Sequence, residues 1–306
     1  MRYSHGLTGS LMLALIVTAC GNETAPSESG GRASSNSSNA PSTVEAPRWL
    51  AAEDYDPALF EGTAGVENRW FPLRPGTRLT YRGSSLDEGK RVRHSVDMIV
   101  TDLVKIIDGI PNAVIWERDY TEGELVEAEL AFFAVDQYRN VWHTGEYPEE
   151  YDAGRIDKTP AWIHGVKGAT AGITLPGQPR VGTPDFAQGF APPPLNWVDR
   201  GRVYKTEQRV CVPAGCYNDV VVIEEFEKGL QDAYQDKHYA PGIGVVRVSW
   251  RGSKDEDKEI LRLVRMAHLS RAEMAEARAA ALEQEERAYR LSKHVYGATA
   301  PAQPTP

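Results

Sequence analysis

The chain has 306 residues, of which 41% are hydrophobic and 25% are charged, and its formal net charge is −9. These proportions are ordinary for a globular protein, and the acidic balance argues against a nucleic-acid partner because phosphate binding needs a basic face. After residue 19 no apolar run reaches the length of about 18 residues that suggests a membrane-spanning helix, so we expect no second membrane anchor.

The N-terminus has the layout of an export signal. Arg2 is followed by the apolar run 11–17, two small residues and Cys20. The run is too short to span a bilayer permanently, and we predict a signal peptide over residues 1–19. A cysteine directly after small residues resembles a bacterial lipoprotein signal, in which Cys20 is acylated and becomes the new N-terminus. The alternative is an ordinary signal peptide that is cut at a nearby small residue.

Residues 20–47 are predicted to be the lipidated cysteine and a disordered linker. The 27 residues after Cys20 contain seven serines and no aromatic residue, so they cannot bury enough apolar surface to become ordered. A flexible tether of that length has a mean reach of about 30 Å. We therefore expect a lipid-anchored protein of the bacterial cell envelope. Gly21 favours the outer membrane, by analogy with enterobacterial sorting, with the domain facing the periplasm or the cell surface.

Residues 48–268 are predicted to form a β domain. Short runs rich in Val, Ile, Tyr, Phe and Trp are separated by Gly, Pro, Asn and Asp, and no long helix alternates with them, which excludes a parallel α/β sheet. We predict a mainly β fold, in which an antiparallel meander forms a curved sheet or half-barrel, with a C-terminal α-helix. The predicted strands cover residues 78–81, 92–107, 113–120, 125–135, 204–210, 220–226 and 245–250.

The chain also matches itself at a shift of 106 residues. Residues 76–134 have ten identities with residues 182–240, over 59 positions, where roughly four are expected from average residue usage. We therefore predict two duplicated halves, residues 72–145 and 178–252. The alternative is that the glycines of any β meander drift into register. Between the halves, residues 160–177 are rich in glycine and are predicted to be a loop that is either ordered by its own packing or functional.

Cys211 and Cys216 are the two cysteines that remain if Cys20 is acylated. They flank a turn-like tetrapeptide between two strand-like runs, so a hairpin would place them opposite each other. We predict a structural disulfide between them. The alternative is a redox pair or half of a metal site, but no further cysteine or nearby histidine completes either.

The C-terminal part has helical character. Ser270 precedes Glu273 by three residues, which is the spacing of a capping box, and residues 269–296 are rich in Ala, Glu and Arg. The apolar seam of this predicted helix is thin and is broken by Gln284, so we expect a solvated helix that rests lightly on the domain. Residues 297–306 are predicted to be a disordered tail.

Three segments carry a resemblance to a known group of proteins. Residues 72–81 contain Pro-x-x-Pro-Gly-Thr, residues 140–146 begin Asn-Val-Trp, and residues 237–244 contain Tyr-Ala-Pro-Gly-x-Gly. In these motifs the chain resembles a bacterial family of uncharacterised exported proteins and lipoproteins, although Arg139 replaces the usual glycine and His143 stands where a tyrosine is common. The resemblance implies no established activity. In outline the meander is also similar to the open half-barrel of periplasmic lipoprotein carriers.

Aromatic and histidine side chains supply the candidate ligand-binding residues. The seven tryptophans are spread along the chain; they are typical of core filling, but some could line an apolar concavity. His143 and His238 fall in corresponding strands of the proposed repeat and could converge, with His164 as a third member; the alternative is that they are ordinary hydrogen-bonding histidines. The candidate ligand-binding residues are Trp142, His143, Trp162, His238 and Tyr239.

No pattern in the sequence predicts a catalytic residue, a metal site or a cofactor. No two histidines have the spacing of a helix-borne metal site, and no Gly-x-Ser-x-Gly or phosphate-loop pattern is present. The acidic group Glu146, Glu149, Glu150 and Asp152 could be a cation site or paired carboxylates. The plainer interpretation is a solvated loop, because adjacent like charges repel.

We therefore predict a membrane-anchored, non-enzymatic lipoprotein whose half-barrel binds an apolar small molecule or an envelope protein. A concave face already filled by the chain's own side chains would count against ligand carriage. One alternative is a cell-envelope hydrolase, which requires a cleft where His143, His238 or Glu146 lies beside a second polar group. The other is a structural adaptor, which requires an exposed apolar patch on the C-terminal helix.

Overall fold

The computed structural model describes residues 54–61 and 67–305 of the chain. The predicted signal peptide, Cys20 and the predicted linker lie outside these residues. Within the described part, no helix is both long enough and apolar enough to cross a membrane.

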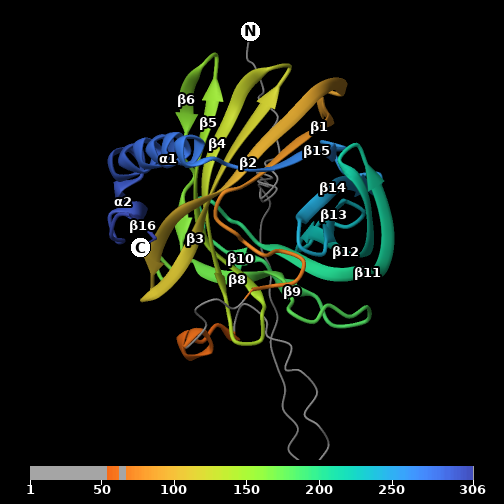
Figure 1. The fold of residues 1–306 in the computed structure, drawn as a ribbon, viewed down its shortest axis with the longest axis horizontal. Helices are drawn as coiled ribbons and strands as arrows, with labels where there is room; N and C mark the ends of the chain where they lie inside the picture. The colour runs from red at the N-terminus through yellow and green to blue at the C-terminus, as the bar shows by residue number, and fades with distance from the viewer. Residues whose placement is uncertain (1–53, 62–66, 306) are drawn as a thin grey trace, which may run out of the picture.

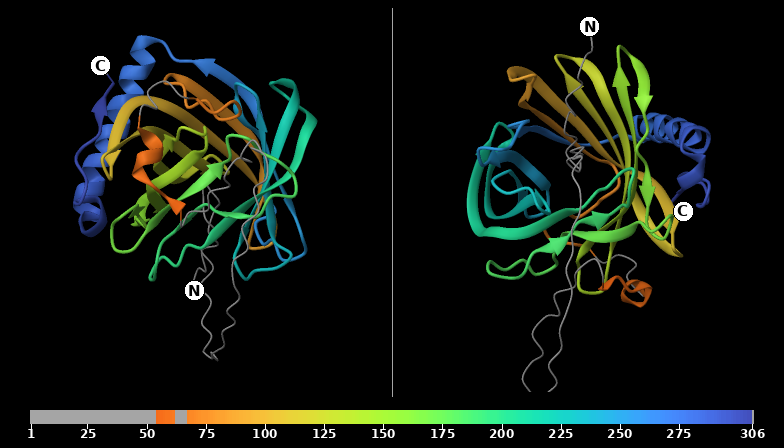
Figure 2. Two further views of the ribbon diagram at one scale, coloured as in Figure 1. Left: turned by 90° about the horizontal axis from the view of Figure 1, so that it is seen from below. Right: turned by 180° about the vertical axis from the view of Figure 1, so that it is seen from behind.

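One antiparallel sheet of sixteen strands curls almost closed (Figure 1). Strand β1 pairs with both β2 and β15, so two successive meanders join into one continuous wall. The two ends of the sheet approach each other at a seam, where β8 and β10 lie near β9 and β11 (Figure 2). The mainly β half-barrel with a C-terminal helix is confirmed. The elements are η2 (Pro57–Phe60), β1 (Thr77–Asp87), β2 (Lys90–Ile107), β3 (Ile110–Thr121), β4 (Glu124–Val135), β5 (Val141–Asp152), β6 (Arg155–Lys158), β7 (Trp162–Ile163), β8 (Thr170–Leu175), β9 (Phe186–Ala187), β10 (Gly189–Phe190), β11 (Asp199–Val212), β12 (Gly215–Glu227), β13 (Tyr234–Ala240), β14 (Gly244–Arg251), β15 (Ile260–His268), α1 (Arg271–Leu291), α2 (Lys293–Tyr296) and β16 (Gln303–Pro304).

Two-residue turns join the first four long strands. Both residues of each turn have a positive φ, as a type I′ turn requires, and glycine at the second position adopts that conformation without strain. Such turns match the twist of the flanking strands and fix their register, and the register decides which side chains face the concave side. The turn pairs are Glu88 with Gly89, Asp108 with Gly109, and Glu122 with Gly123.

The concave face of the sheet is filled by the chain's own side chains. Alternate residues of each strand point inward, and the largest of them form one continuous apolar cluster. Each aliphatic or aromatic side chain buried in this way contributes on the order of 2 kcal/mol to stability. A filled concave face argues against carriage of an apolar ligand inside it. Inward side chains at most 1% exposed include Leu79, Tyr81, Phe133 and Tyr239.

Helix α1 packs on the convex face of the sheet, against β2 and β4 (Figure 1). It begins with the predicted capping box of Ser270 and Glu273. Gln284 is buried rather than exposed: its side-chain oxygen accepts a hydrogen bond from Trp116 Nε1 at 3.0 Å, and its nitrogen donates to the Ala128 carbonyl at 2.7 Å. The expectation of a helix resting lightly on the domain was therefore wrong. Buried polar side chains with partners, rather than an apolar seam alone, attach the helix.

The C-terminal tail is ordered as far as residue 305. β16 pairs with β2, and the buried Ala302 donates its N–H to the Glu285 carboxylate of α1 at 3.0 Å. The Thr305 N–H donates to the Asp102 carbonyl at 2.7 Å. The expected disordered tail over residues 297–306 is thus corrected for the described residues. The tail has no core of its own, but the sheet and the helix supply its partners.

Several strands of the sheet were not predicted from the sequence. Residues 160–177, expected to be a loop, contribute β7 and β8 to the sheet. The predicted strand ranges also did not include β13 or β15. Under the shift of 106 residues, β2, β3 and β4 fall on β11, β12 and β13, whereas β1 has no full-length counterpart. The duplication stays a prediction.

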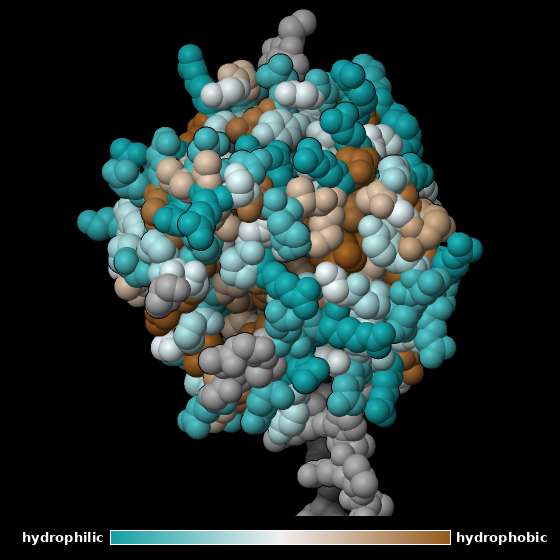
Figure 3. Space-filling view, viewed as in Figure 1, coloured by the Kyte–Doolittle hydropathy of each residue, from teal (hydrophilic) through white to brown (hydrophobic). Residues whose placement is uncertain are grey.

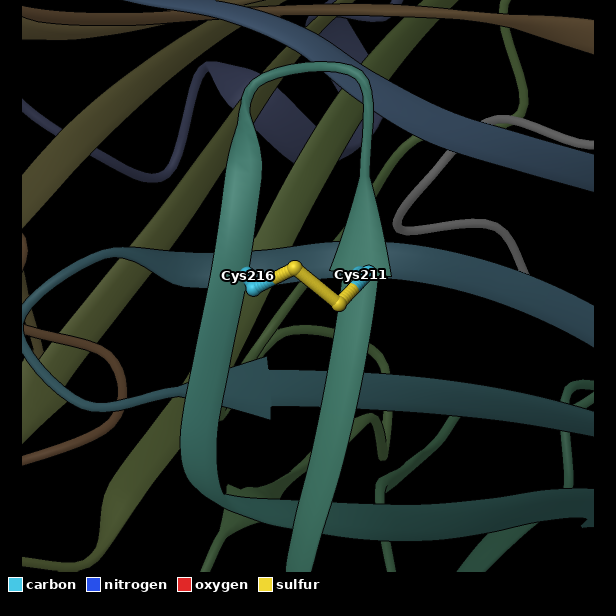
Figure 4. Close-up of a disulfide and its surroundings, with 2 residues drawn as sticks. All are labelled: Cys211 and Cys216. Carbon is cyan, nitrogen blue, oxygen red and sulfur yellow. A yellow bond between two sulfur atoms is a disulfide. The ribbon is translucent and has the colours of Figure 1, made fainter.

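Cys211 and Cys216 form a disulfide at the tip of the β11–β12 hairpin (Figure 4). The two residues are direct cross-strand partners, with Cα atoms 4.0 Å apart. The arrangement is the structural pair that the sequence predicted.

Candidate functional site

Acidic side chains cover one region of the concave face. Residues two apart on a strand share a face, and the register places Glu117 opposite Glu129 and Asp119 opposite Glu127. Together with Glu146 of β5, these side chains belong to residues at most 3% exposed. We call these five residues the acidic interior. Burial of neighbouring carboxylates is costly unless a proton, a cationic partner or a bound ion compensates their charge.

A β-bulge brings a histidine into the same region. The register of β5 against β4 slips by one residue at Thr144. Residues three apart on a regular strand point to opposite faces, whereas this slip lets His143 and Glu146 both point inward. Gly145 lets β7 approach β5 closely beside the bulge, because a Cβ there would lie 2.8 Å from the Trp162 carbonyl oxygen.

Three of these side chains have the arrangement of metal ligands. One ligand atom each from Glu129, His143 and Glu146 lie within 4.8 Å of one another, and His143 Nε2 lies 3.5 Å from Glu146 Oε2. The Nε2 atom has no hydrogen-bond partner, although His143 is only 3% exposed. A metal ion with bonds of about 2.1 Å holds its ligand atoms about 3 to 3.5 Å apart. Small side-chain shifts would therefore complete the coordination.

Three aromatic rings enclose the imidazole of His143. Phe133 stacks on it with ring centroids 4.8 Å apart, and Trp162 and Trp197 meet it edge-on at 5.0 and 5.4 Å. Such packing fixes the orientation of the ring and excludes bulk water from it. The histidine is therefore held in place before any ligand binds.

Burial sets the charge of this site. Burial, and to a lesser extent the charge of Lys237, lowers the pKa of His143 to about 3. Burial and the nearby Glu127 carboxyl raise the pKa of Glu146 to about 8. At pH 7 the metal-free site thus contains a neutral imidazole and a protonated carboxyl group. A bound cation would take the place of the proton.

A small cavity adjoins His143 from the opposite wall of the sheet, with room for about one water molecule. Lys237 Nζ lies 2.6 Å from Glu225 Oε2, so this lysine is already paired. Asp199 Oδ1 has no hydrogen-bond partner, and burial raises the pKa of Asp199 to about 8. The cavity is therefore polar, which does not suit an apolar ligand. Its lining residues are His143, Thr174, Gln188, Trp197, Asp199, Glu225 and Lys237.

Two of the five predicted ligand-binding residues meet at this site. His143 and Trp162 lie in contact. Trp142 lies away from this site: its indole N–H donates to Asp136 at 2.9 Å and its ring packs near Tyr55. Trp142 therefore fills the core instead of lining a cavity.

The other predicted candidates are dispersed. His238 lies on the convex face of β13, and its Nε2 is 3.1 Å from Ser249 Oγ. Tyr239 is a core residue with its ring 5.9 Å from that of Phe71. His164 Nδ1 accepts a hydrogen bond from the Ala171 N–H. Among the described residues, the hydrogen-bond and ion-pair partners of His164 and His238 lie outside the acidic interior, so the expected convergence of three histidines is not seen.

The predicted acidic group of β5 also separates. Glu146 points inward, whereas Glu149 accepts a hydrogen bond from Arg287 of α1 at 2.8 Å. Glu150 lies 3.4 Å from Lys158. The solvated-loop interpretation therefore fails: the segment is a strand, and only one of these glutamates reaches the candidate metal ligands.

Sequence reasoning missed Glu129. The signal was present in β4, where Glu127 and Glu129 stand two residues apart among apolar neighbours, as a polar patch on one face would require. The same spacing occurs at Glu117 and Asp119 in β3. Only the strand register shows that these two patches are adjacent.

No family model and no curated protein matches the chain. Among solved structures it is similar to a Bacteroides fragilis protein assigned as exported, with a YmcC-like fold, at 16% identity over 65% of this chain and 99% of that one, with a TM-score of 0.38. It is also similar to a protein assigned as a lipoprotein from Parabacteroides distasonis, at 10% identity over 66% and 99% of the two chains, with a TM-score of 0.29. Both descriptions match the kind of family that the sequence resembles, but at these TM-scores the likeness carries no argument about this chain.

Proposed function

We propose that the protein is a lipid-anchored protein of the bacterial cell envelope, attached through acylated Cys20, whose β domain binds one divalent transition-metal ion. The ligands of the ion are Glu129, His143 and Glu146. The observation that carries the metal proposal is the convergence of these side chains on an unpartnered imidazole nitrogen inside the sheet. The anchor is supported by the apolar run and the small residues before Cys20.

The charge of the acidic interior favours a dication. His94 already lies between Asp119 and Glu259, and these two carboxylates raise its pKa to about 11 against the opposing effect of burial. Glu146 has no equivalent partner, since no lysine or arginine in residues 54–61 and 67–305 forms an ion pair with it. Two ligand carboxylates and one dication together form a neutral group, which is the arrangement that burial favours.

The donor atoms narrow the choice of metal. One imidazole nitrogen with carboxylate oxygens suits Zn²⁺, Mn²⁺ or Fe²⁺, whereas Mg²⁺ and Ca²⁺ prefer oxygen ligands alone. Three protein ligands leave at least one coordination position open.

The same geometry argues against the other functions considered. His143 and Glu146 do lie beside each other, as a hydrolase requires, but both are at most 3% exposed and a polymeric substrate cannot reach them. A structural adaptor requires an apolar patch on α1, yet Leu291 is a single exposed apolar side chain there, 50% accessible. In Figure 3 the hydrophobic residues of the visible face are scattered among hydrophilic ones.

Native mass spectrometry of the processed chain, extracted from membranes in detergent, tests both parts of the proposal together. We expect the mass of residues 20–306 with added acyl groups, and a metal mass that a chelator removes. Calorimetric titration of the stripped protein with Zn²⁺ and Mn²⁺ should then show one site. Failure to detect either bound or titratable metal contradicts the metal proposal, whereas an unacylated chain contradicts only the anchor.

Substitutions locate the site. Glu146→Gln keeps the shape of the side chain and removes its charge, so metal affinity should fall at least about tenfold, and His143→Gln should act alike. Glu150→Gln on the same strand and His238→Gln on the convex face are matched controls that should bind metal as the wild type does. Equal affinity in Glu146→Gln and Glu150→Gln would place the metal elsewhere.

A further inference from the structure

A row of basic residues crosses the convex face of the sheet. Arg82 of β1 pairs with Arg262 of β15, and Arg262 pairs in turn with Arg247 of β14. We call these three residues the arginine row. His238 of β13 is the next partner of Arg247 and extends the row. The neighbours of these arginines along their strands, such as Tyr81 and Leu261, belong to the core, so the arginines point outward.

The arginine row is unusual because it brings three positive side chains together on adjacent strands. None of its members forms a salt bridge with any residue that the structure describes, although the chain as a whole has an excess of nine negative charges. Asp236 feels the charge of Arg247, but its carboxylate is already bound to Arg251 at 2.7 Å. Like charges directly opposite one another on neighbouring strands are destabilising. The fold therefore keeps three adjacent arginines without an ion-pair partner among the described residues.

The surroundings respond to this positive charge. Burial, followed by the charges of Arg247 and Lys205, lowers the pKa of His238 to about 4. The imidazole is neutral at pH 7 and adds a hydrogen-bonding group beside the arginines instead of a further charge. Lys205 of β11 lies two strands beyond His238, on the far side of Val222 of β12. The basic surface thus crosses six adjacent strands, from β1 to β11.

We propose that the arginine row docks the domain onto the phosphate headgroups of an anionic membrane. Guanidinium groups bind phosphate oxygens through paired hydrogen bonds. The inference goes beyond metal binding and depends on the anchor of the proposed function. A tether of 27 residues after Cys20, with a mean reach of about 30 Å, keeps the domain close to the bilayer. The remaining surface of this acidic domain is repelled by an anionic membrane. The face with the arginine row is therefore the one that approaches the membrane.

The strength of docking follows from the number of charges. Each arginine near an anionic bilayer strengthens binding about fivefold, so the three together account for about a hundredfold. The interaction is screened as salt rises, because exposed charges act over about 10 Å at ordinary ionic strength.

Arginine labelling on vesicles tests the docking directly. The processed chain is reconstituted into vesicles of phosphatidylcholine, alone or mixed with phosphatidylglycerol, and treated with phenylglyoxal before peptide mass spectrometry. We expect protection of the arginine row only in the mixed vesicles, and its loss at high salt. Arg155, Arg271 and Arg290 are exposed on β6 and α1 and serve as internal controls that react equally in both. Equal reactivity of the arginine row in the two vesicle types overturns the proposal.

A matched pair of variants separates specific docking from net charge. Two triple variants each remove three positive charges and so change the formal net charge by the same amount. They are Arg82→Gln/Arg247→Gln/Arg262→Gln and Arg155→Gln/Arg271→Gln/Arg290→Gln. Labelling of Lys205 by an amine reagent reports docking in both variants, and metal binding shows that both are folded. We expect the anionic vesicles to protect Lys205 in the second variant and not in the first. Equal protection in the two variants overturns the proposal.

Two further outcomes are informative. If inorganic phosphate without vesicles protects the arginine row as fully as the anionic vesicles do, the row is a site for free phosphate and membrane docking is overturned. If mass spectrometry finds an unacylated chain, flotation with the mixed vesicles becomes the measure of docking. A failure of the anchor is therefore distinguished from a failure of the arginine row.

Discussion

Two groups of buried charged side chains lie on opposite faces of the same sheet. In only one of them does every charged side chain have a partner in the described part of the chain. On the convex face, Lys105 is fully buried and donates hydrogen bonds to Glu285 at 2.7 Å and to the Tyr289 hydroxyl at 2.9 Å. Its ammonium group also lies 4.1 Å from the Tyr296 ring. Glu285 in turn accepts the Ala302 N–H. Every charge in this group has partners.

The acidic interior on the concave face is different. Glu127 Oε1 and Glu146 Oε2 are buried without hydrogen-bond partners. Burial, together with neighbouring carboxyls such as Glu129, raises the pKa of Glu127 well above its ordinary value. Glu146 is therefore neutral through a bound proton at pH 7, whereas Glu285 is neutralised by the Lys105 ammonium group. The comparison teaches that a buried carboxylate with a cationic partner serves the fold, whereas one that has only a proton indicates a candidate site.

The largest expected effect comes from breaking the complete group. Lys105→Met leaves Glu285 buried without its ammonium partner, and the free energy of unfolding should fall by about 3–5 kcal/mol. Urea unfolding of the purified chain measures it. The double variant Lys105→Met/Glu285→Gln should recover much of the loss, because no unpaired charge remains. A single variant as stable as the wild type would show that this ion pair does not attach the helix.

The fold could be predicted from local signals, and the attachment of the helix could not. Turn pairs such as Asp108 with Gly109, and alternation along the strands, are properties of neighbouring residues and indicate an antiparallel meander. The partners of Lys105 and Gln284 lie more than 150 residues away along the chain. A buried polar residue on a helix resembles an exposed one until its partner is known, so the sequence indicated a solvated helix.

The candidate site was predictable only in part, and for a similar reason. His143 and Trp162 stood out as residue types, but the sequence did not connect them with Glu129. That connection requires the bulge at Thr144, which reverses the alternation of β5 between His143 and Glu146. Strand alternation alone places His143 and Glu146 on opposite faces. The pattern that predicts the sheet therefore does not predict that these two residues meet.

The stability of the protein should depend on pH through Asp199, which lies on the cavity wall opposite β5. Burial raises the folded-state pKa of Asp199 from 3.8 to about 8, so its protonated form stabilises the fold fully below about pH 4. That stabilisation is lost as the pH rises towards 8, with a slope of about 1.4 kcal/mol per pH unit. Asparagine cannot ionise, so Asp199→Asn should remove this contribution. Between pH 6 and 8 the metal-free variant should lose about 3 kcal/mol less stability than the wild type.

Urea unfolding at the two pH values measures the difference. Asp157→Asn, in an exposed position of β6, is the matched control and should keep the wild-type dependence on pH. Parallel pH profiles for Asp199→Asn and the wild type would mean that Asp199 titrates normally in the folded protein. The view that burial leaves carboxyl groups near His143 protonated would then be weakened.

The smallest expected effect compares the two faces most directly, because the same Glu→Gln substitution is made on the concave face and on the convex face. Glu127→Gln removes a carboxyl group whose pKa burial raises well above its ordinary value, so the metal-free protein should gain stability at pH 7. Glu149 is buried on the opposite face and accepts hydrogen bonds from Arg287 at 2.8 and 2.9 Å, so Glu149→Gln should lose about 1–2 kcal/mol. Thermal unfolding in the presence of chelator compares them. The same change in both variants would mean that their carboxylates are equally compensated, whereas opposite signs would show that no cation compensates Glu127 as Arg287 compensates Glu149.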